Sequence, residues 1–284
     1  LQVSDGSTDI KGTAPENILL LDGTEASYNA VKSRLEAINA AGSSSPPTLV
    51  SKLFISGSVP EGMDQSELLG LLGSSHNYVQ NLYMEPVKEV PTNWYLFTNG
   101  NSTLQSINLP QATKIGYNAF NKCTGLTSID LSQVTKIGNG TFVNCTSLTN
   151  IDLSQATDIG ENAFWNCTAL TSIDLPQVTD IREDAFFGCT GLKSIVLSGT
   201  GTENSFALPT CDTTYGLGSQ NFSPENLFLT GVTELTDEQI TQCRNWGNKT
   251  WANIYYNYKG SPSLAEATIE ELTNPDNYTK VTDK

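Results

Sequence analysis

The sequence lacks the motifs that mark common catalytic and metal sites. It contains a single histidine, His76, and neither a G-x-S-x-G serine motif, a C-x-x-C pair nor a D-x-[DN]-x-[DN]-G loop. A catalytic triad that includes His76 would therefore have no supporting motif, and we expect His76 to be a solvated loop residue. The sequence predicts a non-catalytic protein with no cofactor and no bound metal.

Basic residues and long apolar runs are also scarce. Lys and Arg number 15 against 30 Asp and Glu, which gives a formal net charge of −15 and a pI of about 4.3. This balance argues against nucleic-acid binding, which needs a basic surface. No stretch approaches the 18 or so apolar residues of a membrane-spanning helix.

The little charge that is present fits an exported protein. Charged residues are only 16% of the chain, so Ser, Thr, Asn and Gln must cover much of the surface. We expect an extracellular or cell-surface bacterial protein rather than a cytosolic enzyme. The sequence starts without an initiator Met or an apolar leader region, so we expect that a leader has been removed.

What the chain does contain is a repeat. Five cysteines stand 22 residues apart, at Cys123, Cys145, Cys167, Cys189 and Cys211. Apolar residues keep the same period, as in Phe120, Phe142, Phe164 and Phe186. A fixed period in the low twenties is typical of a solenoid, in which one short coil stacks on the next. Such an architecture favours a long binding surface over a pocket.

Each cysteine is followed by the pattern L-x-x-I-x-L. Ile129 and Leu131 are two residues apart, which is strand spacing and places both on one face. Asp130 lies between them and must point the other way. A single coil cannot bury its Leu, Ile and Phe side chains, so stacking must bury them against neighbouring coils.

These repeats resemble the BspA-like (treponemal-type) class of bacterial leucine-rich repeats. The resemblance is carried by the run IGNGTFVNCTSLTNIDL (Ile137–Leu153) and its three relatives. It implies an α/β repeat solenoid with about ten short parallel strands on the concave face, and with irregular coils and a few helices on the convex side. It also implies a surface protein, often lipid-anchored, that adheres to host extracellular-matrix proteins or to other cells.

The strand template extends beyond the strict repeats. Its copies start at Pro15, Val50, Val79, Leu104, Leu126, Leu148, Leu170, Leu192, Pro224 and Trp251. The residue two places into each copy is Ser or Asn in all but one case, Lys52, which supports the register. We expect one continuous sheet; the alternative is an independent N-terminal domain that ends near residue 100.

Three regions follow from this register. We expect an N-terminal capping region with longer irregular repeats (1–103), regular 22-residue repeats (104–211), and C-terminal irregular repeats with a cap (212–284). A helix is predicted over Glu25–Ala41. Thr236 with Gln239, and Ser263 with Glu266, resemble capping boxes of short helices, and the last helix should stop before Asn274-Pro275.

The cysteines are best explained as core residues. Side chains that run parallel into the core do not favour disulfides, although neighbouring coils are about 4.8 Å apart. We therefore expect free buried thiols. Cys243 lies outside the repeat on a predicted helix, and the sequence leaves its state open.

The outward residue four places into each template copy forms what we call the strip. Its members are Leu19, Phe54, Tyr83, Asn108, Asp130, Asp152, Asp174, Val196, Phe228 and Tyr255. The acidic centre could accept Lys or Arg, and the aromatic ends could anchor a partner. The partner-binding candidates are Asn108, Asp130, Asp152, Asp174, Tyr83, Phe54, Phe228 and Tyr255. Two alternatives stay open. In one, the Asp is only a repeat consensus residue; in the other, the chain's own loops cover the aromatic ends.

Two functions are compatible with this surface. The first is a recognition or adhesion protein that binds a protein partner on the concave sheet. The second is a glycan-binding module that uses Tyr83, Phe54, Trp165 or Tyr255 as stacking platforms.

Overall fold

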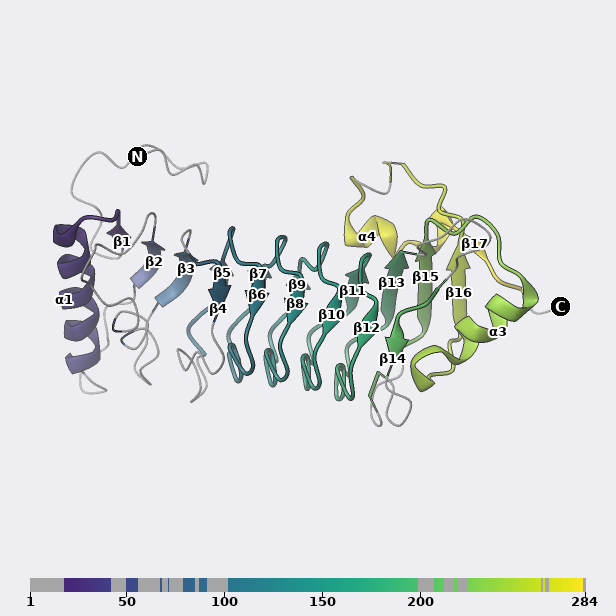
Figure 1. Ribbon diagram of the computed structural model, residues 1–284, viewed down its shortest axis with the longest axis horizontal. Helices are drawn as coiled ribbons and strands as arrows, with labels where there is room; N and C mark the ends of the chain where they lie inside the picture. The colour runs from purple at the N-terminus through teal and green to yellow at the C-terminus, as the bar shows by residue number, and fades with distance from the viewer. Residues whose placement is uncertain are drawn as a thin grey trace.

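The chain folds into a row of stacked coils. The computed structural model describes residues 18–41, 50–55, 67, 71, 79–84, 87–90, 102–198, 207–211, 217–218, 224–261, 263 and 266–282. In Figure 1 the coils follow one another from helix α1 at one end to strand β17 at the other. The expected parallel-strand solenoid is confirmed.

On one side of the coils, each coil contributes one strand. These strands form two sheets that follow one another along the row of coils in Figure 1. The first sheet contains β1 (Ile18–Leu21), β2 (Val50–Ile55), β3 (Val79–Met84), β5 (Ser106–Asn108), β7 (Ser128–Asp130) and β9 (Asn150–Ile151). The other contains β11 (Ser172–Leu175), β13 (Ser194–Ser198), β15 (Asn226–Thr230), β16 (Asn253–Tyr256) and β17 (Thr279–Lys280). All pairs are parallel except β16 with β17. The expectation of one continuous sheet was wrong, because β9 and β11 are not paired with each other.

The strand register expected from the sequence is confirmed from β2 to β9 and from β11 to β16. Lys52 pairs with Asn81, for example, and Asn226 pairs with Asn253. At β1 the expectation was wrong by one residue, because Ile18 and not Asn17 lies opposite Lys52. The strand Ile-Leu-Leu-Leu is apolar at every position, so the alternation that fixes a strand's register is missing there.

The other side of the coils was expected to be irregular, but it carries a parallel sheet of its own, which we call the second sheet. Its strands are β4 (Glu89–Val90), β6 (Lys114–Ile115), β8 (Lys136–Ile137), β10 (Asp158–Ile159), β12 (Asp180–Ile181) and β14 (Thr210–Cys211). The second residue of each strand of this sheet from β4 to β12 is buried, and it is Ile in every one of these strands except β4, where it is Val90. The preceding Thr binds the coil below: Thr157 Oγ1, for example, donates to the Thr135 carbonyl at 3.1 Å.

The core between the two sides is a continuous stack of identical side chains. The rings of Phe120, Phe142, Phe164 and Phe186 are fully buried, and their centroids are 5.5, 5.3 and 5.3 Å apart. Each ring therefore packs on the one in the next coil, which explains why phenylalanine repeats at this position.

The cysteines are free thiols, as expected. In the core the Sγ atoms of Cys145, Cys167 and Cys189 each donate to the carbonyl of the phenylalanine in the preceding coil, as in Cys167 to Phe142 at 3.2 Å. A cysteine is therefore small enough for the core and can also satisfy a buried carbonyl. Cys243 is buried too, on α3, and is also free.

Cys211 does not belong to this row. The structure pairs it with Ile181 in the second sheet, so it occupies the isoleucine position of its coil. The coil-to-coil step at this point is 30 residues for Asp180 and Thr210, not 22. The last 22-residue interval, from Cys189 to Cys211, is thus a coincidence produced by a longer coil.

The two kinds of cysteine should differ in reactivity. Burial raises the pKa of Cys189 and Cys243 to about 12, whereas the Cys211 side chain is only half-buried. At pH 8 we expect a thiol reagent to label Cys211 at least about a hundredfold faster than the other five, because thiolate and access control the rate. Mass spectrometry after timed labelling measures this. Cys211→Ser should remove the fast phase, and a fast phase that survives would contradict the assignment.

Helices occur only toward the two ends of the described chain. The helix α1 spans Glu25–Ala41, as expected. The helix α3 (Asp237–Asn245) begins with the expected capping box of Thr236 and Gln239, and the 3-10 helix η2 (Trp246–Asn248) follows it.

The last helix begins later than expected. It is α4 (Ile269–Leu272), capped by Thr268 and Glu271 rather than by Ser263 and Glu266. Ser263 does bind Glu266, at 3.3 Å, but within a turn. Both pairs have the same sequence pattern, so the pattern alone could not choose between them. The helix ends before Asn274-Pro275, as expected, and the 3-10 helix η3 (Pro275–Asn277) follows.

Candidate binding surface on the strand face

The strand face is the side of β2 to β16 that points away from the core, and it carries two rows of side chains. The first is the Ser/Asn row: Asn81, Ser106, Ser128, Asn150, Ser172, Ser194, Asn226 and Asn253. Hydrogen bonds connect its members toward both ends, from Ser106 Oγ to Asn81 Oδ1 at 2.6 Å and from Asn253 Nδ2 to Asn226 Oδ1 at 2.8 Å. The second row is the strip.

Asp130 and Asp152 are oriented by the turn that follows their strands. Asp130 Oδ1 accepts the Ser132 N–H at 3.0 Å, and Asp152 Oδ1 accepts the Ser154 N–H at 2.9 Å. Such bonds to the residue two positions on stabilise a turn. The repeat therefore has a structural reason to hold Asp here, and each carboxylate keeps a second oxygen for a partner.

The same turn is different beside Asn108 and Asp174. Pro110 and Pro176 stand two positions on, and proline has no N–H to donate. Asn108 Oδ1 is buried and has no hydrogen-bond partner among the described residues. The change from Ser to Pro is visible in the sequence, and our sequence analysis missed its consequence for the strip.

Asp174 is the most perturbed carboxyl group of the strip. Burial, followed by the negative charge of Asp152, raises its pKa to about 7, and a backbone hydrogen bond from Leu175 opposes the shift only in part. The helix α4 lies against β11, the strand of Asp174. Asp174 therefore marks the border between the uncovered centre of the strip and a covered end.

The C-terminal segment, residues 266–282, covers that end. Tyr278 contacts Phe228 and Tyr255, whose own rings stack at 4.7 Å. With Val196 and Leu272 they form a buried cluster, in which Phe228 is 0% and Tyr255 7% exposed. Phe228 and Tyr255 are thus not available to a partner, which corrects our expectation for these two. The cover comes from residues remote in sequence, so the strip pattern could not reveal it.

At the other end, the structure places Tyr83 opposite Asn108 with its side chain half-buried. The backbone of Phe54 pairs with Tyr83, but its side chain lies outside the described residues, as does His76. The structure therefore brings Tyr83, Asn108 and Asp130 side by side through β3, β5 and β7.

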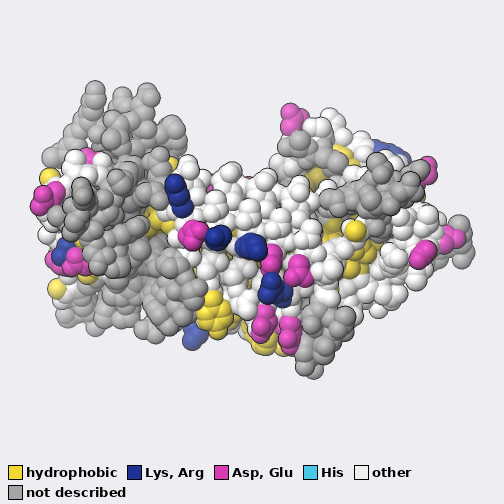
Figure 2. All heavy atoms as spheres, viewed as in Figure 1, with side chains coloured by type: hydrophobic (Ala, Val, Ile, Leu, Met, Phe, Trp, Pro, Cys, Tyr) yellow, Lys and Arg dark blue, Asp and Glu magenta, His cyan; other side chains and the backbone are white. Residues whose placement is uncertain are grey.

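The second sheet carries a different surface. Its charges pair with each other: Lys114 with Glu89 at 3.0 Å, and Arg182 with Asp158 at 3.0 Å and Asp180 at 3.6 Å. Figure 2 shows a row of mixed charges over this sheet, and above it a surface of backbone and of side chains that are neither charged nor hydrophobic. In the part of the chain that is described, no ion pair involves Asp130 or Asp152. Their negative charge is therefore not compensated within this part of the protein.

Among the described residues, no group of three or more His, Cys, Asp or Glu side chains could hold a metal ion. None of their helices has the length and apolar character needed to cross a membrane.

Comparisons with known proteins agree with the fold. Residues 92–207 match the family described as the BspA type leucine rich repeat region, in 6 copies. The comparison with curated proteins found no match.

Several solved structures of bacterial leucine-rich repeat proteins are similar. One is a Bacteroides ovatus protein with 23% identity and a TM-score of 0.46, covering 75% of this chain and 53% of its own length. A leucine-rich repeat protein from T. pallidum has 20% identity and a TM-score of 0.36, covering 71% of this chain and 86% of its own length. A leucine rich cell surface protein from Faecalibacterium prausnitzii has 16% identity and a TM-score of 0.26, covering 79% of this chain and 86% of its own length.

The chain thus spans about half the length of the Bacteroides ovatus protein. Leucine-rich repeat proteins are generally non-catalytic and serve as interaction surfaces. The repeat sequence, the stacked parallel strands and the family match lead to one identification: this chain carries a BspA-type leucine-rich repeat region over residues 92–207.

Proposed function

We propose that this protein is a non-catalytic recognition protein of the bacterial cell surface, and that a protein partner binds the strand face over β5, β7 and β9. Asn108, Asp130 and Asp152 form the centre of this contact, and Tyr83 lies at its edge. Asp174, at the border of the covered end, completes the strip.

The observation that carries this proposal is that the strand face already holds a polypeptide at one end. The segment 266–282 packs on Val196, Phe228 and Tyr255 of the strip. The neighbouring strands present the same two rows of side chains, with Asp152 exposed and Asp130 half-buried. A rigid stacked sheet loses little entropy on binding, which favours recognition by this face.

The chemistry of the uncovered part selects the partner. Two carboxylates without ion pairs, beside uncharged Ser and Asn side chains, favour a segment that offers Lys or Arg. A protein of the host extracellular matrix or of another cell surface fits the family resemblance. An exported, surface-attached protein would expose this face to such partners.

The test removes charge from the strip without disturbing its turns. In the double variant Asp130→Asn/Asp152→Asn, the amide oxygens can still accept the Ser132 and Ser154 N–H groups. Binding to a panel of immobilised, purified extracellular-matrix proteins is measured by biolayer interferometry. We expect the affinity for the best-bound protein to fall about tenfold, with a weaker salt dependence than the wild type shows.

The matched control is Asp158→Asn/Asp180→Asn, which removes the same charge from the second sheet. It should bind like the wild-type protein. Equal losses in both variants would mean that net charge alone governs binding, and no loss in the strip variant would exclude the strip as the contact surface.

A further inference from the structure

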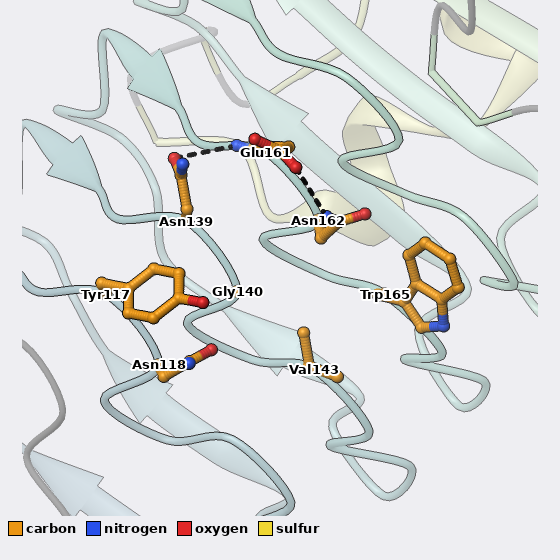
Figure 3. Close-up of a pocket in the computed structure, with 8 residues that line it drawn as sticks. All are labelled: Tyr117, Asn118, Asn139, Gly140, Val143, Glu161, Asn162 and Trp165. Carbon is orange, nitrogen blue, oxygen red and sulfur yellow. Dashed lines mark hydrogen bonds between the residues drawn. The ribbon is translucent and has the colours of Figure 1, made fainter.

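A pocket of about 340 Å³ opens on the turns that connect the two sides of the coils, away from the strip. Figure 3 shows its side chains around an open centre: Tyr117 and Trp165 on opposite sides, Asn139 and Glu161 along one edge, and Gly140 and Val143 between them. Its volume lies at the lower end of the range for small-molecule sites.

The pocket exists because one coil departs from the repeat. This coil differs from its neighbours at two positions. At one of them it has Gly140, where the neighbouring coils have Asn118 and Asn162. All three residues have positive φ, so this position accepts Gly or Asn for conformational reasons. Gly adds no side chain to the pocket, and the end of the Asn118 side chain lies where a Cβ of residue 140 would stand. At the other position Val143 is smaller than Trp165 in the next coil. Both departures remove side-chain volume from the same place.

Two aromatic residues wall this space. Tyr117 is 46% exposed and is the large hydrophobic residue most open to solvent in the described part of the chain. Trp165 is half-buried and stacks on Phe187 with ring centroids 4.1 Å apart, so its ring is held in place. The two side chains come from coils two steps apart, which corresponds to about 10 Å at the spacing of parallel strands. A single six-membered ring fits between walls at this separation.

The polar groups of the pocket are oriented by bonds to one another. Asn139 Oδ1 accepts the Glu161 N–H at 3.1 Å, which directs the Asn139 Nδ2 group the other way as a donor. Glu161 Oε1 accepts from Asn162 Nδ2 at 3.2 Å and leaves Oε2 as an acceptor. A fixed donor beside a fixed acceptor matches a pair of neighbouring hydroxyl groups, each of which donates and accepts.

From this geometry we propose that the pocket binds a neutral pyranose, the terminal residue of a glycan. The apolar face of the sugar ring would lie against an aromatic wall, and two of its hydroxyls would bond to Asn139 and Glu161. The pocket walls lack a cationic residue, so an acidic sugar would meet only the negative charge of Glu161. This site is separate from the strip, and its existence does not depend on the proposed protein partner.

The test uses the whole protein and immobilised neoglycoproteins that end in glucose, galactose, mannose or N-acetylglucosamine. We expect measurable binding to at least one of the four. The variants Tyr117→Ala and Gly140→Asn should each weaken it by about tenfold or more. Gly140→Asn fills the pocket with the residue that adjacent coils already hold here, and it displaces only the end of the Asn118 side chain. Circular dichroism shows whether either variant has lost its fold.

The strip variant Asp130→Asn/Asp152→Asn serves as the matched control and should bind the sugar as the wild type does. This separates the pocket from the proposed function, because each set of variants should affect one ligand only. Binding to none of the four sugars, or binding that both pocket variants leave unchanged, would overturn the proposal.

Discussion

Replacing Phe164 with alanine should lower the free energy of unfolding by about 3–5 kcal/mol, the cost of an emptied aromatic position in a packed core. Phe164 is 0% exposed and lies between Phe142 and Phe186, with ring centroids 5.3 Å away on each side. The substitution removes both stacking contacts at once. Because neighbouring coils support one another, the loss should spread along the repeat rather than stay within one coil.

Denaturant unfolding followed by circular dichroism measures this effect. Tyr117→Ala is the control, because this exposed aromatic lies on the turn two coils away and should change the stability by less than about 0.5 kcal/mol. Similar losses in the two variants would contradict a core built on the phenylalanine stack.

Replacing Asp174 with asparagine should stabilise the protein at pH 8 and not at pH 4. Burial and the nearby charge of Asp152 raise the pKa of Asp174 to about 7 in the folded state, above the value of 3.8 expected of an exposed carboxyl. The folded state therefore holds its proton between these pH values while the unfolded chain releases it. The wild-type protein loses stability as the pH rises from about 4 to 7, and the loss is complete above 7.

The difference in free energy of unfolding between the variant and the wild type should be on the order of 4 kcal/mol more favourable to the variant at pH 8 than at pH 4. Denaturant unfolding of both proteins at the two pH values gives this comparison and cancels the titration of the other carboxyl groups. Asp152→Asn should have a smaller effect in the same direction, because it removes only the second cause of the shift. If the difference in free energy of unfolding between the two proteins is equal at both pH values, the pKa of Asp174 is not raised in the folded state.

The local features of the fold followed from the sequence, because stacking repeats one local pattern. The period of the phenylalanines gave the core, and the Ser/Asn row gave the register from Lys52 to Asn81 and beyond. The prediction was wrong at two places where the repeat pattern is missing or misleading. The apolar run at β1 has no alternation, and a longer coil placed Cys211 at an isoleucine position by chance.

The candidate site was less predictable because its limits depend on contacts between distant segments. The outward position of Phe228 follows from strand alternation, but its burial under Tyr278 depends on how the chain returns after residue 266. The pocket beside Tyr117 shows the opposite case. Its signal was present in the sequence as Gly140 and Val143, two small residues at positions where the next coil has Asn162 and Trp165. These are differences between the repeats, so the residues that the repeats share do not reveal them.

The central claim is that a protein partner occupies the uncovered part of the strip, and carboxyl footprinting tests it most directly. The protein is labelled with a carbodiimide and an amine, alone and with the extracellular-matrix protein that it binds best, and each carboxylate is quantified by mass spectrometry. We predict that the partner protects Asp130 and Asp152, while Asp158 and Asp180 on the second sheet react as in the free protein. Protection of Asp158 and Asp180 with full reactivity of Asp130 and Asp152 would contradict the claim.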